Sequence, residues 1–160
     1  MGMALSDALI FVSKTLQQFE LRDEIKIMAS GKIITGFDIA KAISLGADAC
    51  YSARGMMFAL GCIQALQCDS GKCPVGIATQ DKALYKGLDI TEKSVRVAHF
   101  HNNTLKAFAE FIGACGFDSP KAITPDVFYR RIDHKTNESF ASLFFNDFEN
   151  KVKTEKINLN

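Results

Sequence analysis

Three cysteines, Cys62, Cys68 and Cys73, lie within twelve residues of one another and form the most chemically specific feature of this sequence. They occur in the segment Cys62-Ile-Gln-Ala-Leu-Gln-Cys68-Asp-Ser-Gly-Lys-Cys73-Pro74. Five cysteines spread evenly over 160 residues would place fewer than one in a window of that length. Because thiols that cluster in a reducing compartment usually bind metal or take part in redox chemistry, the spacing predicts a metal site.

The number of thiols favours one kind of metal site over another. Structural zinc needs four donors, commonly as Cys-x-x-Cys pairs, and the segment has neither such a pair nor a nearby histidine. Iron–sulfur clusters take one thiolate for each protein-bound iron, so three cysteines suit a three-iron cluster or a four-iron cluster with one open corner. Spacing alone favours iron–sulfur and leaves open zinc with a distant histidine, or three unconnected core thiols.

Two short turns contain residues suited to binding phosphate, Ser30-Gly31-Lys32 and Ser52-Ala53-Arg54-Gly55. Each follows a predicted strand, and ligands of parallel α/β folds collect at the carboxyl ends of strands. Glycine lets the backbone approach a phosphate, and helix N-termini offer it unpaired N–H groups. Residues 56–60 are predicted to form a short helix beside these turns. The alternative is two ordinary βα turns with solvated basic side chains.

The elements that would position these residues follow from the hydrophobic pattern. Apolar residues at helical spacing predict helices, and Ser6 and Asp7 are predicted to cap the first of them. Short β-prone runs predict strands that alternate with these helices. Helices and strands that alternate with short turns are typical of a parallel α/β sheet. The predicted helices span 6–19 and 37–45, and the predicted strands span 25–29 and 47–51.

The second half of the sequence is predicted to be mostly helical. Helical periodicity predicts a long helix over 91–115 and a short one over 123–131, with Thr124 as its cap and Pro125 in its first turn. Cys50 and Cys115 are predicted core thiols, and His99 and His101 cannot share a side of the long helix. A packed helix is predicted around Phe140, Phe144, Phe145 and Phe148, and residues 149–160 are predicted to be a disordered tail.

Composition excludes several classes of function. The 160 residues are 48% hydrophobic and 23% charged, with a formal net charge of +1, as expected for one globular domain. The scattered basic residues give no reason to bind nucleic acid or an anionic membrane. There is no apolar run near 18 residues and no secretory signal at the N-terminus, so we expect a cytoplasmic protein without disulfides.

Four motifs together resemble a known family. They cover residues 5–131 in matching order, and the cysteine loop is the most specific of them. The resemblance is to the FMN-binding domain of the glutamate synthases, closest to the glutamate-synthase-like FMN proteins that lack the large glutaminase region. The motifs are Ala29-Ser30-Gly31-Lys32-Ile33-Ile34-Thr35-Gly36-Phe37-Asp38, Leu45-Gly46-Ala47-Asp48, Ser52-Ala53-Arg54-Gly55-Met56-Met57-Phe58-Ala59-Leu60-Gly61-Cys62 and Cys73-Pro74-Val75-Gly76-Ile77-Ala78-Thr79-Gln80-Asp81.

The resemblance implies a fold and a pair of cofactors. It implies an α/β chain that forms the C-terminal part, the last βα units, of a (βα)8 TIM barrel, followed by C-terminal helices. It also implies FMN at the carboxyl ends of the strands, a three-iron four-sulfur (3Fe–4S) cluster beside it, and a partial FMN-binding domain over residues 1–148. The implied FMN phosphate ligands are Ser30, Gly31, Lys32, Ser52, Ala53, Arg54 and Gly55, and the implied cluster ligands are Cys62, Cys68 and Cys73.

The resemblance also implies a reaction and its partners. In the family, glutamine-derived ammonia condenses with 2-oxoglutarate, and the reduced flavin gives hydride to the resulting imine to form glutamate. Electrons reach the flavin through the cluster, from ferredoxin or an NADPH-oxidising subunit. The sequence starts Met1-Gly2, without the N-terminal cysteine nucleophile of the family's glutaminase reaction.

A complete barrel needs about 250 residues and eight strands, and two strands are predicted here. We therefore expect another chain to supply the missing strands. The substrate pocket would be built largely by those strands, so no residue here is assigned as a substrate ligand or a proton donor. The alternatives to an enzyme fragment are a non-catalytic electron-relay or assembly subunit, and an inactive truncated remnant.

Overall fold

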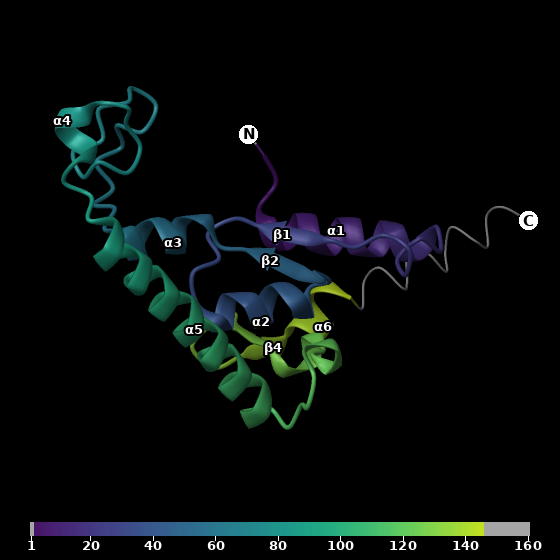
Figure 1. Cartoon of the computed structure of the whole chain (residues 1–160). Helices are drawn as coiled ribbons and strands as arrows, with labels where there is room; N and C mark the ends of the chain where they lie inside the picture. The colour runs from purple at the N-terminus through teal and green to yellow at the C-terminus, as the bar shows by residue number, and fades with distance from the viewer. Residues whose placement is uncertain (1, 146–160) are drawn as a thin grey trace, which may run out of the picture.

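The computed structural model describes residues 2–145, which form a mixture of helices and short strands (Figure 1). None of the helices in this range is both long and apolar enough to span a membrane. In chain order the elements are α1 (Leu5–Gln18), β1 (Met28–Ser30), α2 (Gly36–Ser44), β2 (Ala49–Tyr51), α3 (Ala53–Leu60), α4 (Lys82–Tyr85), α5 (Ile90–Ala114), the 3-10 turns η1 (Pro120–Ala122) and η2 (Pro125–Val127), β3 (Tyr129–Arg131), β4 (Asn137–Ser139) and α6 (Phe140–Phe144).

Strands β1 and β2 form a parallel pair connected by helix α2. Met28 lies opposite Ala49, and Ser30 lies opposite Tyr51. Parallel strands need a crossover between them, and α2 provides it. The predicted α/β character of the front of the chain is confirmed.

Both strands are shorter than the predicted spans of 25–29 and 47–51. The N–H of Ile27 donates to the Asp48 carboxylate at 2.8 Å, so a side chain takes a ladder position just before β1. The same carboxylate forms an ion pair with Arg22 at 2.9 Å. The Ile27 carbonyl also accepts the N–H of Asp48 at 2.8 Å, so side-chain and backbone bonds together join the two segments just before β1.

Helix α1 begins earlier than its predicted cap. Its N-cap is Ala4, which is extended and uses no side-chain cap, and the Ala4 carbonyl accepts the N–H of Ala8 at 2.9 Å. Ser6 and Asp7 lie inside the first turn, so the prediction that they cap the helix is wrong. Asp7 still suits this position because a carboxylate favourably meets the positive end of the helix dipole.

Helix α2 has well-defined ends. The Thr35 hydroxyl accepts the N–H of Asp38 at 3.1 Å, and the Asp38 carboxylate accepts the N–H of Thr35 at 2.9 Å, which makes a capping box. Beyond its C-cap, Gly46 has a φ of 110°, where glycine is favoured. The helix runs one residue ahead of the predicted 37–45.

The long helix α5 packs against α2 and α3 (Figure 1). A Cβ added to Gly36, the first residue of α2, would lie 2.5 Å from the Phe108 nitrogen of α5. The absence of a side chain at residue 36 thus lets the two helices touch. The buried core cluster consists of Leu9, Ile10, Ala29, Ile33, Ala40, Ala42, Leu45, Ala47, Ile112, Ile123, Phe128 and Phe140.

A lysine of α1 is buried against the C-terminal part of the described chain. Lys14 is 6% exposed, and its ammonium donates to the Phe144 carbonyl at the end of α6. The same ammonium lies 4.7 Å from the ring centre of Phe145. A charge-assisted hydrogen bond and a cation–π contact therefore hold α6 to α1.

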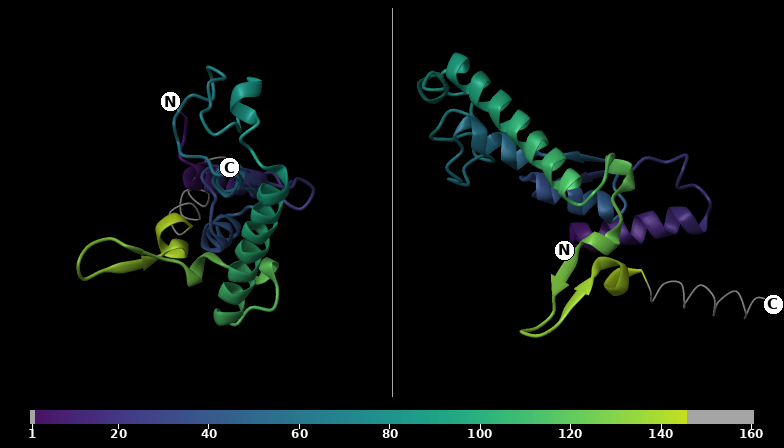
Figure 2. Two further views of the ribbon diagram at one scale, coloured as in Figure 1. Left: turned by 60° about the vertical axis from the view of Figure 1, so that its left-hand side comes forward. Right: turned by 90° about the horizontal axis from the view of Figure 1, so that it is seen from below.

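The predicted helix over 123–131 is wrong. A single 3-10 turn follows Thr124, whose side chain caps nothing, and Phe128 then becomes extended. The next residues form the antiparallel β3–β4 hairpin, which projects from the rest of the molecule (Figure 2). The Asp133 carboxylate shapes its turn by accepting the N–H groups of Lys135 and Thr136. The pairing of β3 with β4 and the burial of Phe128 outweigh the helix-start signal of Thr-Pro.

The phenylalanine-rich segment forms a helix as predicted, although a short one. The rings of Phe140 and Phe144, the first and last residues of α6, meet edge to face at 5.4 Å, and Phe145 follows as the C-cap. Phe148 and the predicted tail over 149–160 lie outside the described residues.

The two cysteines outside the loop are half-buried, and two histidines lie exposed on the long helix. Cys50 is half-buried and packs against the core, as predicted. Cys115 is half-buried at the C-cap of α5 and does not belong to the core cluster, so its predicted core position is wrong. His99 and His101 are both exposed on α5.

Candidate functional site

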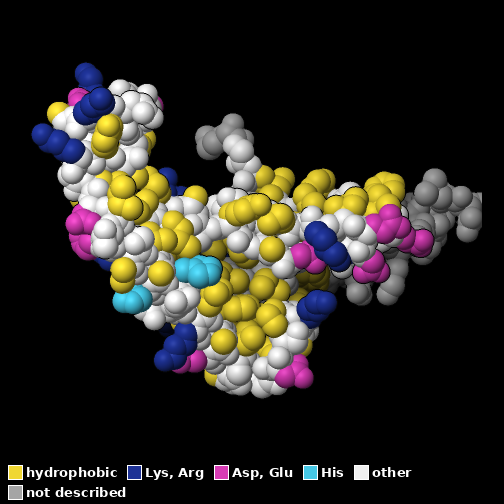
Figure 3. Space-filling model, in the orientation of Figure 1, with side chains coloured by type: hydrophobic (Ala, Val, Ile, Leu, Met, Phe, Trp, Pro, Cys, Tyr) yellow, Lys and Arg dark blue, Asp and Glu magenta, His cyan; other side chains and the backbone are white. Residues whose placement is uncertain are grey.

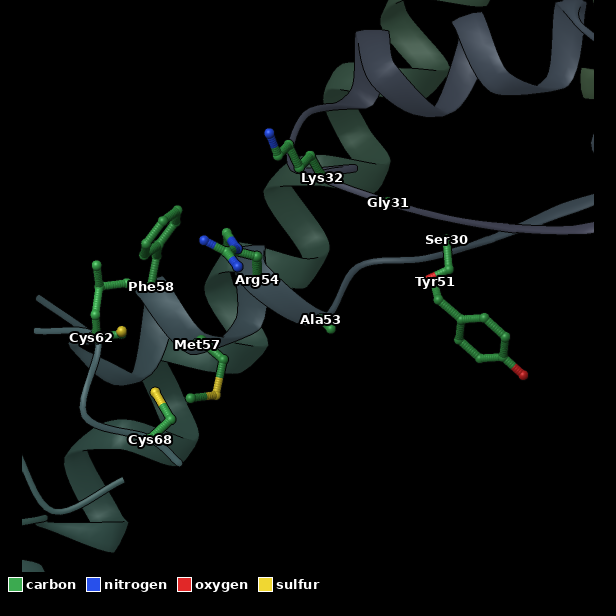
Figure 4. Close-up of a pocket in the computed structure, with 11 residues that line it drawn as sticks. Ser30, Gly31, Lys32, Tyr51, Ala53, Arg54, Met57, Phe58, Cys62 and Cys68 are labelled. Carbon is green, nitrogen blue, oxygen red and sulfur yellow. The ribbon is translucent and has the colours of Figure 1, made fainter. Parts of the chain in front are cut away.

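A cavity of about 440 Å³ lies where β1 and β2 end and where the cysteine loop begins (Figure 4). Three segments line it: the turn after β1, the end of β2 with the first part of α3, and the loop after α3. The lining residues are Ser30, Gly31, Lys32, Tyr51, Ala53, Arg54, Met57, Phe58, Cys62, Leu66 and Cys68.

The turn after β1 has an unusual backbone. Gly31 has a φ of 153° and Lys32 a φ of 55°, a conformation that few residues other than glycine adopt. The next residue, Ile33, is buried in the core and anchors this turn. Lys32 is exposed, and its side chain extends to the same side of the cavity as that of Arg54 (Figure 4). Two cations therefore face one part of the cavity.

Ser52 ties the second turn to the first. Its hydroxyl donates to the Ile33 carbonyl at 2.7 Å, so it does not cap α3, which follows directly. The first turn of α3 also contains no acidic residue. Its N–H groups are thus left without a side-chain acceptor among the described residues. An anion is the ligand that such a helix start favours.

Gly55 acts through packing and does not line the cavity. A Cβ at this position would lie 2.6 Å from the Ser52 hydroxyl oxygen and 2.9 Å from Cζ of Phe100 on α5. Glycine therefore lets α3 approach α5 while Ser52 keeps its bond to the first turn.

The cysteine loop runs from the end of α3 to α4, with Asp81 capping α4 through a 2.8 Å bond from the N–H of Ala83. Cys62 and Cys68 line the cavity, and the Cys62 sulfur accepts the N–H of Gln64 at 3.5 Å. Two of the three predicted cluster ligands therefore face the same space as the two basic residues.

Cys73 is buried, with 7% of its surface exposed. The N–H of Ala78 is the main cause of a lowered pKa of its thiol, opposed by desolvation and assisted by the N–H groups of Val75, Ile77 and Gly76. Gly76, at a φ of 78°, makes this wrapping possible, because a Cβ there would lie 2.7 Å from the Leu84 carbonyl oxygen. Backbone N–H groups that favour a thiolate suit a cysteine that binds iron.

The three thiols do not converge on a common point. Within residues 2–145, no group of three His, Cys, Asp or Glu side chains is arranged to hold a metal ion. Metal binding and the final arrangement of its ligands are generally coupled, because thiolates repel one another until a cation lies between them. The donor set thus matches a cluster in residue type and in the environment of Cys73, but the three thiols would have to move toward one another to bind one.

The cavity brings together most of the residues predicted from sequence. Those that line it are Ser30, Gly31, Lys32, Ala53, Arg54, Cys62 and Cys68, whereas Ser52, Gly55 and Cys73 do not line it. Four lining residues were not predicted: Tyr51, Met57, Phe58 and Leu66. Tyr51 directly precedes Ser52, and Met57 and Phe58 belong to the helix predicted over 56–60 beside the turns, whereas no sequence signal indicated Leu66. The predicted helix 56–60 begins earlier, at Ala53.

Comparison with known proteins gives one family. The family model described as the conserved region in glutamate synthase matches residues 1–118. The chain is 41% identical over 133 residues to the glutamate synthase large subunit-like protein YerD of Bacillus subtilis, covering 82% of this chain and 25% of that protein.

Two further relatives are similarly long. The archaeal glutamate synthase [NADPH] of Methanocaldococcus jannaschii is 39% identical over 122 residues, and the archaeal-type glutamate synthase [NADPH] of Thermotoga neapolitana is 35% identical over 126 residues. Each match covers 76% of this chain and 24% of the relative. The chain thus spans about a quarter of the length of these curated relatives.

Proposed function

Because the chain belongs to the glutamate synthase family, we propose that it contributes the last βα units of a (βα)8 barrel that makes glutamate with FMN and a 3Fe–4S cluster. The observation that carries the proposal is the single cavity shared by two basic turns and two cysteines. Phosphate sites of such barrels lie in the last βα loops, which agrees with the location of this cavity at the carboxyl ends of β1 and β2.

The FMN phosphate would bind between the two turns. Lys32 and Arg54 would supply positive charge, and the uncapped N–H groups at the start of α3 would supply hydrogen bonds. Ser52 would hold the turns at a fixed separation through Ile33. This chain's part in binding FMN is therefore to orient its phosphate end.

The cluster would be held by Cys62, Cys68 and Cys73. The N–H groups around the Cys73 sulfur would keep that ligand as a thiolate and would stabilise negative charge on the cluster. When bound, FMN would supply hydride for the reductive amination of 2-oxoglutarate with glutamine-derived ammonia, and the cluster would pass it electrons from ferredoxin or an NADPH-oxidising subunit.

The proposal is tested by anaerobic reconstitution of the chain with iron and sulfide. We expect about three irons per chain with iron–sulfur absorption. Cys68→Ser and Cys73→Ser should each lose most of this iron. Cys115→Ser is the matched control, because this thiol lies at the end of α5 and away from the loop, and it should keep the iron.

The opposite pattern would refute the cluster assignment. A wild-type chain without iron, or equal iron loss in the Cys115 and Cys68 variants, would show that the loop does not bind a cluster. Iron without any flavin in the assembled protein would instead favour an electron-relay subunit.

A further inference from the structure

The sheet formed by β1 and β2 has one covered face and one bare face. Ala29 is 1% exposed and belongs to the core cluster with residues of α1 and α2. Side chains alternate along a strand, so its neighbour Met28 points the other way and is 52% exposed. Tyr51 on β2 is 56% exposed, and its hydroxyl lies 3.7 Å from the Met28 sulfur. Both helices therefore cover one face, and apolar side chains are exposed on the other.

Both outer edges of this sheet are also open. Among residues 2–145, β1 pairs only with β2, and β2 pairs only with β1. Parallel sheets are found almost always with both faces covered, and an open edge is a template for another strand. Figure 3 shows hydrophobic side chains exposed over α1, the strands and α2, with most charged side chains toward the periphery.

The length of the relatives indicates what covers this surface. They are about four times as long as the part that this chain matches. A second copy of this chain fits less well, because a twofold axis would pair one edge in antiparallel fashion and leave the other edge open. Two open edges and a bare face between them need a partner that reaches both edges.

We propose that the bare face and the outer edges of β1 and β2 form a docking surface for the βα units that the relatives carry outside the matched region. Strands of that partner pair in parallel with both edges, and its apolar side chains cover Met28 and Tyr51. The inference rests on the proposed barrel, since the partner is defined as the rest of it.

The test supplies the partner as a separate polypeptide. The Bacillus subtilis relative without the 133 residues that this chain matches is co-expressed with this chain, and native mass spectrometry records complexes. We expect a one-to-one complex in which hydrogen exchange at Met28–Ser30 and Ala49–Tyr51 slows at least tenfold. Met28→Asp should weaken the complex at least tenfold. Ile90→Asp, at an 80% exposed position on α5, is the matched control and should weaken it less than twofold.

A chimera keeps the inference testable if the shortened relative does not fold alone. In it, this chain replaces the matching region within the full-length relative. Met28→Asp should then lower the stability of the chimera more than Ile90→Asp does, and the same amides should be protected. Equal effects of the two substitutions, unprotected amides, or self-association of the chain through Met28 in place of the complex would each overturn the inference.

Flavin and iron content separates this inference from the proposed function. A complex that depends on Met28 but holds neither FMN nor iron would support the docking surface and refute the function. Iron bound by the chain without any complex would support the cluster and overturn the docking surface.

Discussion

Replacing Gly36 by alanine should weaken the packing of α2 against α5. The new Cβ would lie 2.5 Å from the Phe108 nitrogen, 2.9 Å from its Cα and 3.0 Å from the Ala107 carbonyl carbon. All three are backbone atoms of α5, so no side-chain rotation relieves the contact. The helices would have to separate by about 1 Å to restore ordinary van der Waals distances.

The expected cost follows from two opposing effects. Overpacking of this kind costs about 1–3 kcal/mol, and the close backbone contact puts Gly36 at the upper end. Alanine in place of glycine returns up to about 1 kcal/mol through helix propensity. The net expectation is a loss of about 2 kcal/mol in the free energy of unfolding.

Urea unfolding followed by circular dichroism measures this change. Gly113→Ala is the matched control, because it is also a helical glycine and a Cβ there meets nothing within 4 Å. It should leave the protein unchanged or more stable by up to about 1 kcal/mol. If Gly36→Ala is as stable as Gly113→Ala, the described contact between α2 and α5 is incorrect.

Three further predictions test other parts of the structure. Lys14→Met removes the hydrogen bond to the Phe144 carbonyl and the cation–π contact with Phe145. It should lower the free energy of unfolding in urea by about 2 kcal/mol and speed hydrogen exchange in α6. Unchanged exchange in α6 would show that these contacts do not hold α6 to α1. Arg54→Gln should weaken binding of FMN to the chimera by about tenfold. Binding of riboflavin, which has no phosphate, should not change. The control Lys86→Gln, at an exposed position, should alter the binding of neither FMN nor riboflavin. Burial acts to raise the pKa of Asp38, but hydrogen bonds from Thr35 and Ile34 outweigh it and hold that pKa below the ordinary 3.8. The ionised Asp38 therefore stabilises the fold fully above about pH 4, and this stabilisation is lost as the pH falls through the lowered pKa. The stability difference between wild type and Asp38→Asn should therefore shrink as pH falls below 4 in acid unfolding, and a constant difference would refute this role.

The front of the fold could be predicted because its signals are local. The helical periodicity over 37–45 and the β-prone runs over 25–29 and 47–51, which predict α2, β1 and β2, are each patterns of a few neighbouring residues. Thr124 and Pro125 form a strong local helix-start pattern, which predicts a helix where the structure has the β3–β4 hairpin. The pairing of β3 with β4 and the burial of Phe128 are tertiary effects that outweigh it.

The candidate site was predictable in part for the same reason. Residue type and position after a strand identified Lys32 and Arg54, which line the cavity. The same pattern could not show that the Ser52 hydroxyl bonds to the Ile33 carbonyl, since that contact depends on how two strands pair. Leu66 lines the cavity through the path of an irregular loop, for which sequence gives no period.

The bond between Ser52 and Ile33 has a consequence for how this family can vary. It joins the two basic turns directly, so their separation is set by the alignment of β1 with β2 and not by the helix between them. Insertions or replacements on the outer side of that crossover should be tolerated during evolution without altering the distance between Lys32 and Arg54. A shift of one strand by a single residue would break the bond and turn that strand's own lining side chain, Ser30 on β1 or Tyr51 on β2, to the opposite face. Natural variation should therefore spare strand alignment and accumulate in the crossover.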